Sequence, residues 1–167
     1  MGNTFIKGAE VYIDKVFTRK TIEIEGSKIK IHEEDYALPS DAVEVNSEGK
    51  KLVPGFIDIH THGGVGVDVN SATADELEKI GEFFASNGTT SWLCSILTDT
   101  KEQTEWCIEQ FNEYQKSERS GSNLVGIHLE GPFLAKEYKG AMPEYLLSKF
   151  DIDLLREYQE KSGGNVR

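Results

Sequence analysis

The sequence predicts an α/β protein in which a small β-rich region precedes parallel β-strand and α-helix units. Residues 1–53 contain short runs in which apolar and polar residues alternate, as in half-buried strands. Residues 54–167 instead alternate apolar strands with longer helical patterns. Connections that contain a helix join parallel strands. We therefore expect two regions, 1–53 and 54–167, and a parallel sheet in the second.

The first region predicts a β-hairpin and several short strands. Residues 21–33 read TIEIEGSKIKIHE, in which isoleucines alternate with polar residues on both sides of the pair Gly26-Ser27. Residues 9–17, AEVYIDKVF, predict a third strand, and residues 41–45 and 51–53 predict short edge strands. This region is expected to be part of a small β-sandwich.

The second region predicts strands and helices in strict alternation. Its first strand, GFIDIHTHGG, ends in glycines, and Thr73 and Glu76 then form a capping-box pattern that begins a helix. Leu77, Ile80 and Phe83 with Phe84 recur at helical spacing in that helix. The elements that follow are a strand over 89–97, a helix that begins at Thr100, a strand over 123–132 that Pro132 cuts off, a helix over 153–161 and the beginning of a fourth strand at 165–167.

Two architectures fit this order of elements. Right-handed connections between parallel strands build either an open doubly wound sheet or a (β/α)8 barrel. No GxGxxG pattern follows the first strand, so a dinucleotide-binding fold lacks its main support.

The composition excludes several classes of partner. Of the 167 residues, 38% are hydrophobic and 28% are charged, as in soluble globular proteins. The net charge of −11 repels phosphate backbones and anionic lipids, so neither nucleic acid nor a membrane is expected as a partner. Neither a signal peptide nor a run of roughly 18–20 apolar residues is recognisable. We expect a cytoplasmic chain whose Cys94 and Cys107 are buried free thiols.

Two strands carry residue types that bind metals. Asp58, His60 and His62 share one face of the first strand because strand side chains alternate with period two. His128 and Glu130 share one face of the third strand in the same way. Carboxyl ends of parallel strands meet at one edge, where ligands and catalytic groups gather. The sequence therefore predicts a site at this edge.

His60 and His62 are predicted as a metal-binding pair, since two imidazoles add little to an apolar interior. Glu130 requires a metal or a cationic partner there. Asp58 is expected to support the pair rather than bind the ion, and for His128 a ligand role and a hydrogen-bonded structural role both stay open. Nitrogen and carboxylate donors without thiolate indicate Zn, Fe, Mn or Ni, and such a site favours hydrolysis.

Three motifs carry a family resemblance. LVPGFIDIHTHGGVGVDV resembles the first barrel strand of the amidohydrolase superfamily, which enters a metal-dependent barrel from a small β-sandwich. NGTTSWLCSILTD and GIHLEGPFLAKEYKGAMP resemble segments of the N-acetylglucosamine-6-phosphate deacetylases in particular. The resemblance implies an incomplete (β/α)8 TIM-like barrel, formed by three βα units and the start of a fourth.

The resemblance also implies an activity and its residues. The family removes the acetyl group from N-acetylglucosamine 6-phosphate, giving glucosamine 6-phosphate and acetate, with one or two divalent ions. By position, Glu130 is a principal metal ligand and His60 with His62 offers a further metal position. Ala141 and Met142 lie where the family contacts its phosphorylated amino sugar. The full-length form is expected to be a homo-oligomer.

The resemblance covers only part of a barrel, which needs about 250 residues. It implies that the general-base aspartate and two further metal histidines lie beyond Arg167. We therefore expect an amino-terminal fragment that is inactive alone. Two alternatives stay open: an amidohydrolase for a different amide, because Met142 cannot donate a hydrogen bond, or a non-catalytic product that binds a metal or a partner.

Overall fold

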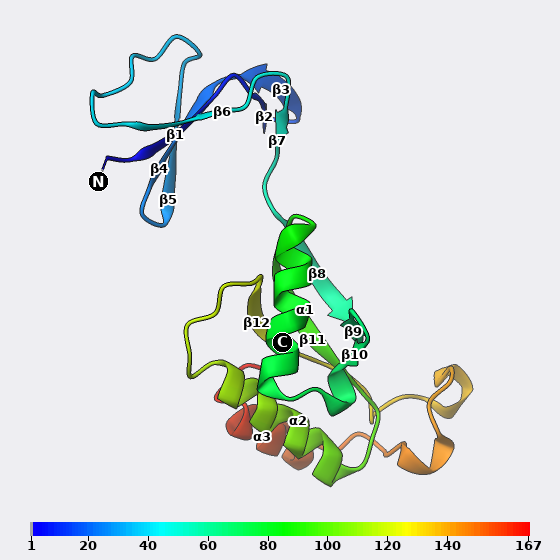
Figure 1. Cartoon of the computed structure of the whole chain (residues 1–167). Helices are drawn as coiled ribbons and strands as arrows, with labels where there is room; N and C mark the ends of the chain where they lie inside the picture. The colour runs from blue at the N-terminus through cyan, green and yellow to red at the C-terminus, as the bar shows by residue number, and fades with distance from the viewer. Residues whose placement is uncertain (1) are drawn as a thin grey trace. The chain divides into compact units, whose positions relative to one another are not determined.

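The computed structural model describes residues 2–167 and divides the chain into two compact units, Met1–Pro54 and Gly55–Arg167 (Figure 1). The first unit contains β-strands, and the second combines a parallel sheet with three α-helices. The chain is thus a mixed α/β protein. None of the helices in the described part is both long and apolar enough to span a membrane.

The first unit consists of two small sheets. One has the strand order β5-β4-β1-β6 and the other the order β3-β2-β7. The predicted hairpin is confirmed as β4 and β5, which pair antiparallel on both sides of Gly26. The strands are β1 (Thr4–Lys7), β2 (Glu10–Ile13), β3 (Val16–Arg19), β4 (Thr21–Glu25), β5 (Lys28–His32), β6 (Val43–Asn46) and β7 (Lys51–Leu52).

Two strand predictions in this unit were wrong in detail. Residues 9–17 were expected as one strand but form the hairpin β2–β3, because the chain reverses at Asp14 and Lys15. Both residues have positive φ angles, 50° and 69°, as the inner residues of a tight hairpin turn require. Strand β1 was not predicted at all, although it joins β4 to β6 in the larger sheet.

The second unit confirms the predicted alternation of strands and helices. Its parallel sheet has the order β12-β11-β8, so strands that follow one another in sequence are neighbours. Val166 forms a parallel bridge with Ile127, which is where a fourth strand was predicted to begin. The main elements are β8 (Phe56–Thr61), α1 (Ala74–Ser86), β11 (Thr89–Leu97), α2 (Lys101–Tyr114), β12 (Asn123–Glu130) and α3 (Ile152–Lys161).

Short elements complete the second unit. A small antiparallel ribbon follows β8, and three single-turn 3-10 helices lie in the connections. The ribbon strands are β9 (Gly63–Gly64) and β10 (Val67–Asp68), and the 3-10 helices are η1 (Val69–Ser71), η2 (Lys136–Tyr138) and η3 (Glu144–Leu146).

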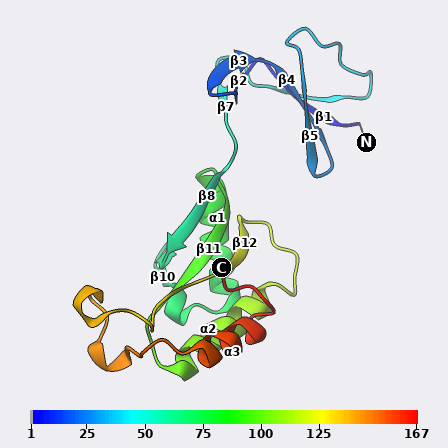
Figure 2. The ribbon, with the colours of Figure 1, turned by 180° about the vertical axis from the view of Figure 1, so that it is seen from behind.

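The helices lie on one side of the sheet, α1 beside α2 and α2 beside α3 (Figures 1 and 2). Alternate residues of the central strand, such as Trp92 and Ile96, point into the core between sheet and helices. Ile80, Ile108 and Tyr158 meet them from the three helices, each at most 1% exposed. Burying these side chains holds the strands in register, with their carboxyl ends at one edge.

Side-chain caps fix where the helices begin. The backbone N–H of Thr73 donates to Glu76 Oε2 at 3.0 Å, as the capping-box pattern predicted. Thr100 Oγ1 accepts from the N–H of Gln103, and Asp151 Oδ1 accepts from two N–H groups of α3. Of the two adjacent phenylalanines of α1, Phe83 is 43% exposed, whereas Phe84 packs edge-on against Trp92.

Candidate metal centre

The structure brings His60, His62 and Glu130 together at the carboxyl edge of the parallel sheet. His60 is near the end of β8, His62 follows that strand directly, and Glu130 is the last residue of β12. The central strand β11 separates them in the sheet order. The period-two alternation of the strands therefore aims side chains from two separate segments at one point.

The three ligand-type atoms converge closely. Glu130 Oε2 lies 2.8 Å from His60 Nε2 and 2.9 Å from His62 Nε2. The two Nε2 atoms are 3.2 Å apart. The side chains remain accessible, with exposed fractions of 55% for His60, 37% for His62 and 30% for Glu130. The centre is thus a compact, open set of two nitrogens and one oxygen.

This arrangement fits a divalent ion. Bonds of about 2.0–2.1 Å to one ion place two ligand atoms about 3.3 Å apart in tetrahedral geometry and about 2.9 Å apart in octahedral geometry. The separations between the three atoms, 2.8–3.2 Å, are within about 0.1 Å of that range. Imidazole and carboxylate donors suit Zn, Fe, Mn or Ni, and they do not choose among these metals.

The electrostatics keep Glu130 ionised. Burial alone raises the pKa of this carboxyl, but the hydrogen bond from His60 and the charges of His62 and His60 outweigh it, so the pKa lies below its ordinary value. Burial and then the charge of His60 lower the pKa of His128. At neutral pH the centre therefore presents a carboxylate, and the lowered pKa of His128 favours the uncharged form of that imidazole.

His128 is not a member of the three-residue cluster. Its Nδ1 lies 2.9 Å from Ser95 Oγ, and its ring centroid is 4.8 Å from that of His60. Of the two roles left open for His128, the contacts favour the hydrogen-bonded one. Asp58 also lies outside the cluster, and its Oδ1 accepts the backbone N–H of His60 at 3.0 Å.

Two residues that the sequence analysis missed support the centre. Ser95 lies between β8 and β12, where its carbonyl is 3.1 Å from His62 Nδ1 and its hydroxyl contacts His128. Thr98 donates a hydrogen bond to the backbone carbonyl of Glu130. Ser95 is fully buried and Thr98 is 6% exposed. Ser95 lies within the apolar run WLCSIL and Thr98 directly follows it. A polar residue at such a position was the sequence signal that could have identified both.

The residues expected to contact substrate lie in the segment after β12. Ala141 is exposed, whereas the side chain of Met142 is buried. Lys139 Nζ donates to the carbonyl of Met142 at 2.8 Å, which is a hydrogen bond within this segment. Within residues 2–167, no hydrogen bond joins Ala141 or Met142 to the three residues of the cluster.

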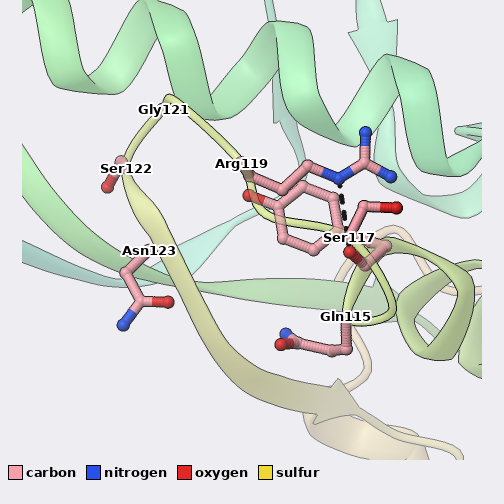
Figure 3. Close-up of a pocket in the computed structure, with 7 residues that line it drawn as sticks. Gln115, Ser117, Arg119, Gly121, Ser122 and Asn123 are labelled. Carbon is pink, nitrogen blue, oxygen red and sulfur yellow. Dashed lines mark hydrogen bonds between the residues drawn. The ribbon is translucent and has the colours of Figure 1, made fainter.

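A polar pocket elsewhere in this unit is a separate feature. It is a cavity of about 210 Å³ beside the loop between α2 and β12, and Arg119, Gln115 and Asn123 are among its lining residues (Figure 3). The Arg119 guanidinium points toward α1, where Asp75 and Glu78 lie 3.6 and 3.7 Å away. Its charge is thus already compensated, and the pocket offers no free cation for a ligand.

Comparison with known proteins identifies relatives of the chain. No family model matches it. It is 33% identical over 139 residues to the N-acetylglucosamine-6-phosphate deacetylase of Bacillus subtilis (strain 168), covering 81% of this chain and 33% of that protein. It is 31% identical over 115 residues to an N-acetylgalactosamine-6-phosphate deacetylase of Escherichia coli O157:H7, covering 69% of this chain and 30% of that protein.

A solved structure extends this likeness to the fold. The crystal structure of N-acetylglucosamine-6-phosphate deacetylase from Pasteurella multocida matches with a TM-score of 0.85 and 26% identity. The match covers 98% of this chain and 43% of the other. The chain spans about a third of the length of the curated relatives it matches. Over most of its length, the chain is therefore a homologue of the N-acetylglucosamine-6-phosphate deacetylase family.

Proposed function

We propose that this chain is the amino-terminal part of a metal-dependent hydrolase that removes the acetyl group from N-acetylglucosamine 6-phosphate. The products are glucosamine 6-phosphate and acetate. The convergence of His60, His62 and Glu130 carries the proposal, because it provides a metal centre in a chain homologous to these deacetylases.

The arrangement of the second unit supports a barrel segment. Sequential strand order with all three helices on one side is the arrangement of neighbouring βα units in a (β/α)8 barrel. A doubly wound sheet instead has helices on both faces. We propose that β8, β11 and β12 are the first three strands of such a barrel and that Val166 begins the fourth.

His60, His62 and Glu130 would hold one or two divalent ions. A bound ion supplies Lewis acidity toward an amide carbonyl and lowers the pKa of water. The chain's own contribution is to aim two imidazole nitrogens and an ionised carboxylate at one point and to leave that point open to solvent. The proposed ligands come from rigid strand ends, which keeps their geometry fixed.

The proposed substrate is a small phosphorylated amino sugar, and Ala141 and Met142 are proposed to lie next to it. The net charge of −11 favours a small molecule over a nucleic acid as the partner. N-acetylgalactosamine 6-phosphate is a second candidate substrate. One relative, 31% identical to this chain, is named N-acetylgalactosamine-6-phosphate deacetylase. The two sugars differ in the orientation of one hydroxyl. Measuring acetate release from each of them therefore shows which one is the substrate.

The residues 1–167 alone are proposed to release no acetate. They supply three candidate ligands, and the relatives they match are about three times as long. A general-base aspartate and further metal histidines are proposed to come from later strands of the barrel.

A chimera tests the proposal. Residues 1–167 replace the matching part of the Bacillus subtilis deacetylase, and acetate release from both sugars is measured with added Zn, Fe, Mn or Ni. We expect activity that Glu130→Gln abolishes, while the exposed Glu102→Gln on α2 serves as the matched control. A folded chimera that binds metal but releases no acetate from either sugar would contradict the assignment and favour a different amide or a non-catalytic metal-binding role.

A further inference from the structure

Ser95 connects all three strands of the parallel sheet. It lies on the central strand β11 in register with His128 of β12, and it is fully buried. Its hydroxyl oxygen accepts the backbone N–H of Thr61 from β8 at 3.1 Å and lies 2.9 Å from His128 Nδ1. Its carbonyl oxygen lies 3.1 Å from His62 Nδ1. One residue thus contacts the rings of two histidines at the candidate metal centre.

The contact with His62 determines which ring nitrogen carries the proton. A carbonyl oxygen can only accept, so Nδ1 of His62 must donate to the carbonyl of Ser95. Once an ion replaces the contact between Nε2 and the acceptor-only carboxylate of Glu130, the lone pair of the neutral ring is on Nε2. That is the atom 2.9 Å from Glu130 Oε2 and 3.2 Å from His60 Nε2. The carbonyl therefore directs the ligand atom of His62 into the cluster.

In the contact with His128, the ring nitrogen accepts the hydrogen bond instead of donating it. The hydroxyl of Ser95 already accepts the N–H of Thr61, and its own proton needs an acceptor because the residue is buried. Of its two partners among residues 2–167, only Nδ1 of His128 can accept. The hydroxyl then donates to His128, whose proton lies on Nε2. Its ring also lies outside the group of three residues whose ligand-type atoms converge.

We propose that Ser95 is a positioning residue that sets the tautomers of two histidines in opposite ways. Its carbonyl makes His62 a ligand through Nε2, and its hydroxyl holds His128 with the proton on Nε2 and so keeps it from binding the ion. The part of this inference that concerns the ion rests on the proposed function. The proton on Nδ1 of His62 and the tautomer of His128 are properties of the metal-free chain.

Nitrogen NMR of the full 167-residue chain tests the tautomers directly. The ring nitrogens of 15N-labelled histidines are recorded without metal, at a pH where the rings are neutral. We expect Nδ1 to be protonated in His62 and unprotonated in His128. A protonated Nδ1 in His128 would overturn the proposal, and this measurement needs no variant.

Variants of Ser95 distinguish the role of its hydroxyl from the role of its backbone carbonyl. In Ser95→Ala, His128 is expected to populate both tautomers while His62, bound to the backbone, is unchanged. Ser95→Thr restores the hydroxyl and is expected to restore the His128 tautomer. Ser122→Ala is the matched control, because Ser122 is 2% exposed and its hydroxyl has no hydrogen-bond partner within residues 2–167. A folded Ser95→Ala chain with an unchanged His128 spectrum would overturn the role of the hydroxyl.

Titration with Zn²⁺ tests the selection of ligands. We expect zinc to shift the Nε2 signals of His60 and His62 and to leave Nδ1 of His128 as an unprotonated acceptor. Coordination of zinc by His128 in the unmodified chain would overturn the proposal. If zinc shifts no histidine signal, the proposed metal centre fails, whereas the tautomers in the metal-free spectrum still support the role of Ser95.

Discussion

Thr98 donates a 2.7 Å hydrogen bond to the backbone carbonyl of Glu130, so the end of β11 fixes the end of β12 where the proposed metal ligand is attached. Thr98→Val removes this bond and keeps the shape of the side chain. We expect the free energy of unfolding to fall by about 1 kcal/mol. We also expect zinc affinity to fall by about tenfold, as is typical when a residue that supports a ligand is lost.

Urea unfolding and zinc titration of the same samples measure the two effects. Thr90→Val is the control, because Thr90 is exposed and its contact with the carbonyl of Phe56 is 3.5 Å long. Equal zinc affinity in Thr98→Val and the unmodified chain would show that Glu130 does not depend on this bond.

Gly131 should not tolerate a side chain. Its φ angle is +103°, and an added Cβ would lie 1.8 Å from the hydroxyl oxygen of Thr98. Gly131→Ala therefore combines a strained backbone with a clash, and we expect a loss of about 2 kcal/mol or more in the free energy of unfolding. Gly140→Ala is a matched comparison, since its φ is +58° but no atom lies within 4 Å of the added Cβ. It should lose about 1 kcal/mol. Similar losses in both variants would contradict the predicted clash at Thr98.

The sequence was sufficient to predict the main features of the centre because they depend on local periodicity. The alternation within FIDIHTH places His60 and His62 on one face, and parallel strands bring Glu130 to the same edge. Neither step needs knowledge of distant contacts. The same local patterns predicted the capping box at Thr73 and the turn at Gly26.

The features that were missed depend on neighbours that are distant in sequence. Ser95 and Thr98 resemble ordinary strand residues until their partners on β8 and β12 are known. The hairpin between β2 and β3 was missed for a different reason. Asp14 and Lys15 adopt positive φ without a glycine, so the turn lacks its usual marker.

Glu23 should make the first unit sensitive to acid. Its side chain accepts hydrogen bonds from Asn3 at 2.7 Å and contacts His32 at 2.7 Å, and these two contacts, in that order, hold its pKa below the ordinary 4.5. At pH values between the lowered pKa and 4.5, the unfolded chain therefore binds more protons than the folded chain. The contribution of Glu23 to stability is complete above pH 4.5 and is lost as the pH drops through the pKa of the folded state.

Thermal unfolding between pH 3 and 7 tests this dependence. Glu23→Gln should flatten the acid side of the profile, whereas Glu25→Gln on the same strand should not, because within residues 2–167 the carboxylate of Glu25 forms an ion pair only with the exposed Lys30. An unchanged acid profile in Glu23→Gln would assign the dependence to other carboxyls.

The two cysteines should be unreactive in the folded chain. Burial raises the pKa of Cys94 to about 12 and that of Cys107 to about 11, and both thiols are buried in the core of the second unit. Because the thiolate is the nucleophile, a disulfide reagent at pH 8 should modify neither cysteine in the native state and both in guanidinium. Rapid modification of Cys94 without denaturant would indicate that the core opens readily.

The larger sheet of the first unit should promote self-association through one apolar face. Cross-strand partners share a face, and the register pairs Ile22 with Ile31 and Ile24 with Ile29. Ile22 is 3% exposed, but Ile29 is 67% and Ile31 is 51% exposed, and they belong to the edge strand β5. An apolar face beside an open strand edge is a common route to association.

Ile29→Lys should therefore lower the associated fraction in sedimentation velocity over a range of protein concentrations. Because Ile29 is largely exposed, the free energy of unfolding should change by only about 0.5 kcal/mol. Ser27→Lys is the control: it adds the same charge in the adjacent turn but removes no apolar surface. If both variants reduce association equally, net charge rather than the apolar face is responsible, since only Ile29→Lys removes exposed hydrocarbon.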